Sequence, residues 1–132
     1  MPLSHREILL TFDPLRPPMP QFSADAGGVV DFHGVVRGLE GADAIAGIDY
    51  EAHQEMARHQ LSKIVEETAE RFPVLGVILH HRIGFVPVAE ASLFLRVSAG
   101  HRGPAFEAAE LLVVLLKQRV PIWKHPVSRA SV

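Results

Sequence analysis

The residues of this chain with the clearest chemical potential lie between positions 101 and 124, which read HRGPAFEAAELLVVLLKQRVPIWK. Pro104 can open a helix, because proline at a first helical position gives up no hydrogen bond that the helix needs. Lys117 and Arg119 fall in the last turn, Pro121 ends the helix, and Trp123-Lys124 follow in an extended segment. The helix N-terminus, with its unpaired N–H groups and the adjacent His101-Arg102, predicts an anion site.

A simpler interpretation applies to each of these cations. Lys117 and Arg119 can act as ordinary surface charges that complement the helix dipole. Arg37 closes an expected strand and precedes a loop with two glycines, a position where function concentrates. Taken alone, Arg37 is equally an exposed arginine at a strand end.

Hydrophobic spacing predicts an α+β fold with two main helices and mostly antiparallel strands. One helix is expected over His53–Phe72 and ends before Pro73, and the terminal helix is expected to bury Phe106, Ala109, Val113 and Leu116. The strands on either side of the loop Gly38–Asp43 suggest a hairpin with a long connection. Residues 13–20 hold too many prolines for regular structure. The expected strands are Arg6–Phe12, Val29–Arg37, Ala44–Glu51, Leu75–Gly84 and Ala91–Ala99.

Composition describes one globular domain over residues 1–132. The chain is 48% hydrophobic and 21% charged, and it contains no cysteine, so neither disulfides nor thiolate chemistry is available. The sequence shows no secretion signal and no apolar run near the ~20 residues that a membrane span needs, so we expect a cytoplasmic protein.

Charge is distributed unevenly along the chain. Residues 1–50 hold three Arg against seven Asp or Glu, whereas residues 96–132 hold six Lys or Arg against two Glu. Such segregation favours an anionic ligand or an acidic partner. The basic residues form no stripe interleaved with aromatics, which argues against nucleic acid.

The eight histidines do not predict a metal site. His53 and His59 are six positions apart and off a shared helical face, and no HExxH motif is present. His80 and His81 are adjacent in an expected strand, so their side chains point to opposite faces. We expect neither a metal nor a cofactor.

Several motifs together resemble the catalytic (large) subunit family of molybdopterin synthase. The resemblance covers about residues 27–124 in one collinear run and leaves a short tail, 125–132. The matching segments are Gly28–Arg37 (GVVDFHGVVR), Ile48–Ala52 with Met56-Ala57, His81–Gly84 (HRIG), His101-Arg102 with Ala105–Ala108 (AFEA), and Lys117 with Pro121–Lys124 (PIWK).

This resemblance implies an α/β-hammerhead-like fold and a specific reaction. In the family, a small ubiquitin-like carrier brings a C-terminal Gly-Gly thiocarboxylate to cyclic pyranopterin monophosphate, and two successive sulfur transfers yield molybdopterin without a metal. The large subunit forms a homodimer within a heterotetramer.

The same resemblance assigns roles to individual residues. Lys117 and Lys124 match the catalytic lysines. Arg37, His101 and Arg102 match substrate-contacting positions, the His-Arg pair coming from the neighbouring protomer, and His125 is expected to join this set. Clustered cations suit a cyclic phosphate, and they lower a lysine pKa.

Three positions depart from the family pattern: the tail continues as His125-Pro126, the Gly-Glu turn reads Ala89-Glu90, and Val114 replaces an acidic residue. The rival hypothesis is a non-catalytic homologue that binds a pterin-like anion or a ubiquitin-like partner.

Overall fold

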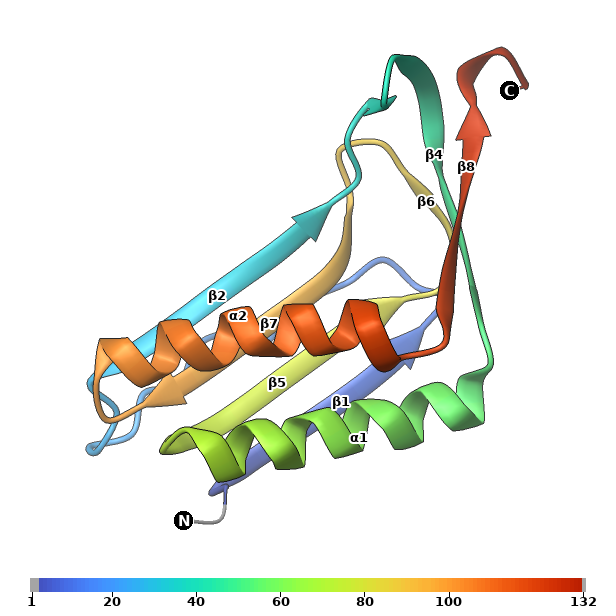
Figure 1. The fold of residues 1–132 in the computed structure, drawn as a ribbon. Helices are drawn as coiled ribbons and strands as arrows, with labels where there is room; N and C mark the ends of the chain where they lie inside the picture. Colours follow the sequence, from blue (N-terminus) through green and yellow to red (C-terminus); the bar gives the residue numbers. More distant parts are fainter. Residues whose placement is uncertain (1–2, 132) are drawn as a thin grey trace.

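Two helices lie side by side across one face of a four-stranded sheet (Figure 1). The structure, a computed structural model, describes residues 3–131. The helices are α1 (Gln54–Arg71) and α2 (Arg102–Arg119). The sheet has the order β1-β5-β7-β2, in which only the β1–β5 pair is parallel. Its strands are β1 (His5–Thr11), β5 (Val74–Arg82), β7 (Ala91–Ala99) and β2 (Gly28–Val35). The predicted α+β class is therefore confirmed.

A smaller sheet rises at the end of the molecule where α2 ends (Figure 1). Its long strand β4 (Asp43–Ala52) pairs antiparallel with β6 (Gly84–Pro87) and with β8 (Ile122–Ser128), and the two-residue β3 (Leu39–Glu40) pairs with the start of β4. The short helix η1 (Arg129–Ser131) follows β8. The tail beyond Lys124 is thus largely a paired strand.

The expected hairpin across the loop 38–43 is wrong. β2 pairs with β7 in the first sheet, whereas β4 belongs to the second. The reason lies at Val36, which is buried in the core of the small sheet. Its N–H donates to the carbonyl of Glu90, and its carbonyl accepts from the N–H of Ala89. These bonds tie the chain to the turn between β6 and β7 instead of leading it back along β2.

The main core lies between the helices and the first sheet. From α1 it receives Ala57, Leu61, Ile64 and Val65, and from α2 it receives Ala105, Ala108, Ala109, Leu112 and Leu116. The small alanines let α2 approach the strands closely. Four residues form the second core with Val36, namely Ile45, Ile48, Tyr50 and Val86.

The helix boundaries follow the sequence closely, and the buried face of α2 does not. α1 ends one residue before Phe72, and its N-cap is His53, whose ring accepts from the N–H of Met56 at 3.3 Å. α2 begins at Arg102, so Pro104 is its third residue and not its first. Phe106 was expected in the core but is 61% exposed, because it is one position past Ala105 and therefore turned about 100° away. Phe32, on the edge strand β2, is 40% exposed.

Candidate active site

The N-terminus of α2 carries the His101-Arg102 pair in an exposed position. His101 is the N-cap in extended conformation, and its side chain makes no capping bond. A shallow hollow here is lined by Gly27, Gly100, His101 and Arg102. A Cβ at Gly28 would lie 2.9 Å from the Cα of Arg102, so glycine is needed for β2 to start beneath the helix. The free N–H groups of this turn, the Arg102 guanidinium and the His101 imidazole form a surface suited to an anion.

Lys117 stands at the other end of the same helix. It is exposed in the last turn, as the sequence predicted. Arg119, also in that turn, forms an ion pair with Glu67 and so joins α2 to α1. Lys117 makes no ion pair with any residue in the range 3–131, so its charge remains available to a ligand.

Lys124 lies on β8, directly across from Tyr50 of β4. Directly paired residues share one face of a sheet, so the Lys124 side chain projects on the side of the buried Tyr50 ring. The edge of that ring meets the imidazole of His81 with centroids 5.3 Å apart and planes at 75°. Lys124, Tyr50 and His81 therefore line up from three different strands.

His81 is a buried, neutral imidazole at the end of β5. Burial lowers its pKa from 6.5 to about 4; the hydrogen bond to the carbonyl of Arg82 opposes this, and the positive charge of Lys124 reinforces it. Burial likewise raises the pKa of Tyr50, while the Ser92 side chain acts in the opposite direction. The two aromatic side chains next to Lys124, His81 and Tyr50, are thus uncharged at neutral pH.

His125 follows Lys124 but faces the other way. Side chains alternate along a strand, so His125 projects from the opposite face of β8. There its Nε2 bonds the carboxylate of Glu51 at 2.9 Å. The structure does not bring His125 to the lysine face, and its predicted role in substrate binding stays a prediction.

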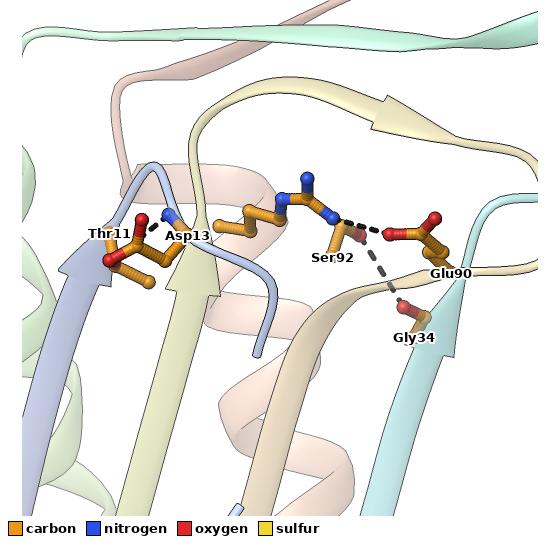
Figure 2. A network of polar contacts seen from close by, with 6 residues as sticks. Thr11, Asp13, Gly34, Glu90 and Ser92 are labelled. Carbon is orange, nitrogen blue, oxygen red and sulfur yellow. Dashed lines mark hydrogen bonds and ion pairs between the residues drawn. The ribbon is translucent and has the colours of Figure 1, made fainter. Parts of the chain in front are cut away.

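Arg37 is exposed two residues after β2, and the segment that precedes it is held by a polar network (Figure 2). The guanidinium of Arg82 donates to Glu90 at 2.8 Å, and the hydroxyl of Ser92 donates to the carbonyl of Gly34 at 3.4 Å. With the two bonds of Val36, these contacts fix the end of β2 against the turn between β6 and β7. They therefore set the direction from which Arg37 leaves the sheet.

Within a single chain, the predicted site residues fall into two groups that lie at opposite ends of the molecule. β2 starts beneath the N-terminus of α2 and runs about 26 Å over its eight residues, so its far end lies toward the end of the molecule where α2 finishes and β8 begins (Figure 1). Arg37 follows that end of β2 by two residues. Arg37, Lys117 and Lys124 thus share one end of the molecule. His101 and Arg102 occupy the other. Sequence reasoning missed Tyr50 and His81 as neighbours of Lys124, because only the pairing of β4 with β8 reveals them.

Residues 3–131 contain no group of three or more His, Cys, Asp or Glu side chains arranged to hold a metal ion. None of their helices is long and apolar enough to cross a membrane.

Comparison with known proteins identifies the family of the chain. The family model for the MoaE protein matches residues 11–119. The molybdopterin synthase catalytic subunit of Thermoplasma volcanium is 38% identical over 103 residues, covering 78% of this chain and 75% of that protein. The crystal structure of molybdopterin synthase from Staphylococcus aureus superposes with a TM-score of 0.81 at 28% identity, covering 91% and 90% of the two chains.

A further solved structure, the complex of subunits 1 and 2 of molybdopterin-converting factor from Helicobacter pylori, matches with a TM-score of 0.66 at 22% identity, covering 80% of this chain and 68% of that one. The fold is thus the fold of the molybdopterin synthases. The chain belongs to the MoaE family of molybdopterin synthase catalytic subunits, enzymes of molybdenum cofactor biosynthesis.

Proposed function

We propose that this chain transfers sulfur from the thiocarboxylated C-terminus of a small ubiquitin-like carrier to cyclic pyranopterin monophosphate. Lys117 and Lys124 act as the catalytic lysines. Arg37, His101 and Arg102 bind the substrate, and His125, which was also expected to do so, faces away from the lysines and bonds Glu51 instead. The observation that carries the proposal is the pair of exposed lysines at the junction of α2 and β8, neither of which forms an ion pair within residues 3–131.

Two cations at this junction suit the proposed reaction. The substrate phosphate requires positive charge around it, and more negative charge develops on it when sulfur bonds to the carbon and the bond between that carbon and the phosphate oxygen breaks. Lys117 and Lys124 supply that charge, and either can donate a proton to the departing oxygen. Arg37, at the same end of the molecule, adds a planar guanidinium that can grip phosphate oxygens in pairs.

The remaining binding residues require a second copy of the chain. His101 and Arg102 lie a helix length away from Lys117, so the site is completed by the neighbouring protomer of a homodimer. The carrier then binds each site to form a heterotetramer. The Helicobacter pylori complex of two subunits supports a small-subunit partner for this fold.

The test is reconstitution with a thiocarboxylated carrier and the pterin precursor, followed by mass spectrometry of the product. Wild-type chain should form molybdopterin, and Lys117→Ala should abolish it. The loss of an exposed last-turn lysine should change the free energy of unfolding by less than about 1 kcal/mol. Lys63→Ala, which removes an exposed lysine of α1, is the matched control and should remain active.

The alternative, a non-catalytic homologue that binds a pterin-like anion, predicts a different result. In that case the wild-type chain would bind the precursor and form no product at any carrier concentration. Full activity of Lys117→Ala would instead show that Lys117 is not catalytic and serves only as a surface charge that complements the helix dipole.

A further inference from the structure

One flank of α2 carries a surface stripe that starts and ends with a cation. Its members, at intervals of four, seven and four positions, are Arg102, Phe106, Val113 and Lys117. At about 100° per residue they lie within about 60° of one another around the helix. Phe106 is 61% exposed, Val113 is partly buried, and both cations are exposed. The fold of a single chain therefore leaves apolar surface between the two cations.

The stripe faces away from α1. Arg119 marks the side of α2 that is turned toward α1, because it forms an ion pair with Glu67. Around the helix, Phe106 is turned about 140° from Arg119, and Val113 about 120°. The face of α2 between these directions packs on the sheet, where α2 contacts β7 and β2. The stripe therefore lies on the side of the molecule where β2 forms the edge of the sheet (Figure 1).

β2 leaves one of its own edges unpaired on that side. It pairs with β7, and no other strand within residues 3–131 pairs with it. Phe32 points to the helix side of the sheet, because Val30, two positions earlier, packs against the main core. The one charged residue of the strand, Asp31, is bound by Arg96 and does not guard the edge. A long edge strand without free charges is suited to pairing with another chain.

The intervals within the stripe are symmetric about its middle. In two identical helices that pack antiparallel about a two-fold axis, positions whose numbers have the same sum face each other. The sums 102 + 117 and 106 + 113 are both 219, so one axis midway between positions 109 and 110 serves both pairs. A rotation that brings Arg102 of one copy to Lys117 of the other thus also sets Phe106 against Val113.

The first sheet is compatible with the same axis. Gly28 of β2 lies against Arg102, and the axis lies about 11 Å from Arg102 along α2. The same distance along β2 from Gly28 ends near Asp31 and Phe32, in the middle of the strand. If two β2 strands lie side by side at a spacing of about 4.8 Å, α2 helices placed over β2 and β7 are about 10 Å apart. This is the distance of helices in packing contact.

We propose that a second copy of this chain covers this surface, with the two α2 helices antiparallel and Phe106 of each copy packed against Val113 of the other. The inference rests on the proposed function, which needs His101 and Arg102 from a neighbouring protomer, and it names the surface that brings them. The apolar contacts lie between the two sites. At each end of the interface a guanidinium meets an ammonium, and an anion between them, the substrate phosphate, relieves the repulsion of these like charges.

Cysteine crosslinking tests the position of the axis. The chain has no cysteine, so an introduced thiol is unique. Glu110 is exposed and lies next to the axis, so Glu110→Cys chains should be joined efficiently to each other by a short bismaleimide. Gln118→Cys is the matched control, because it is exposed on the same helix but lies about 26 Å from its own copy along the helix direction. Absence of Glu110→Cys dimers, or equal yields at the two positions, would overturn the proposal.

A charge substitution tests the packing. Phe106→Asp places two carboxylates in the contact and leaves the core untouched, so the dissociation constant of the dimer should rise at least about tenfold in sedimentation experiments. Val114→Asp is the matched control. Val114 is 42% exposed on the same helix, turned about 80° from Phe106, so its substitution should leave the constant unchanged. A Phe106→Asp chain that dimerises as tightly as wild type would refute the packing.

Sulfur transfer separates this inference from the proposed function. If Glu110→Cys forms crosslinked dimers and the wild-type chain yields no product with carrier and precursor, the interface stands and the proposed function fails. If wild type yields product and Glu110→Cys gives no crosslinked dimer, the function stands and its sites are assembled through another surface.

Discussion

Arg102 and Lys117 stand at opposite ends of α2, 117 − 102 = 15 positions apart and so about 22 Å apart along the helix axis. Both lie on the surface, and the helix between them is one continuous element that packs on the first sheet. No bending of the chain can bring them to one small substrate. If both contact it, they must come from different copies of the chain.

This separation predicts complementation between two inactive variants. Lys117→Ala and Arg102→Ala should each lose sulfur transfer as pure homodimers. After subunit exchange, a hybrid dimer contains one site with both substitutions and one site with neither. About half of the dimers are hybrids, and each hybrid has one of its two sites intact. The mixture should therefore recover up to about a quarter of wild-type activity.

The control for that experiment is a mixture of the Lys117→Ala and Lys124→Ala variants. Both lysines lie at the same end of one chain, so every site in this hybrid lacks one of them and activity should not return. Recovery in the control, or none in the Lys117→Ala and Arg102→Ala mixture, would show that the site is built in another way.

Replacing Ala89 by glycine should increase the stability of the protein. It has a φ of 70° in the turn between β6 and β7, a left-handed conformation that costs a residue with a Cβ about 1–2 kcal/mol. Ala89→Gly should therefore raise the free energy of unfolding by about 0.5–1 kcal/mol, once the greater chain entropy of glycine is subtracted. Chemical denaturation measures the difference.

Gly41 is the matched position for the reverse change. Its φ is 61°, and a Cβ there would meet nothing within 4 Å, so Gly41→Ala tests the backbone strain alone. It should destabilise the protein by about 1 kcal/mol. Opposite signs at the two positions would confirm the interpretation, and a loss of stability in Ala89→Gly would refute it.

The buried His81 predicts sensitivity to acid. Its pKa is about 4 in the folded protein and about 6.5 when unfolded, so between these values the unfolded chain binds a proton that the folded chain does not. Stability must then rise with pH across this window and fall on acidification from about pH 6.5 to 4. The full effect of this one group is about 3 kcal/mol.

Comparing variants isolates the contribution of His81. Unfolding free energies of His81→Gln, measured from pH 7 to 4, should fall less steeply than those of wild type. His59→Gln removes an exposed histidine of α1 and should keep the wild-type slope. Parallel curves for wild type and His81→Gln would mean that His81 is not held neutral by the fold.

Local signals in the sequence predicted the helices well, and distant strand pairing limited the rest. The break at Pro73 and the cation-rich last turn of α2 are features of a few neighbouring residues, so α1 and α2 were placed within a residue or two. By contrast, β4 meets β8 about seventy residues later, and no local pattern encodes that contact. The surroundings of Lys124 follow from that pairing, which is why the sequence predicts the lysine but not that Tyr50 and His81 lie beside it.

The last prediction concerns the carrier, whose extended C-terminal tail should enter between Lys117 and Lys124. A Gly-Gly tail has no Cβ and can follow a path too narrow for other residues. The cations proposed to bind the substrate phosphate should also attract the terminal carboxyl group of the tail, so binding should weaken with salt without vanishing. A carrier with an activated C-terminus should acylate Lys117 or Lys124, forming an isopeptide bond that mass spectrometry locates. Lys63, on the exposed face of α1, is the internal reference, and capture there with neither Lys117 nor Lys124 modified would disprove this path for the tail.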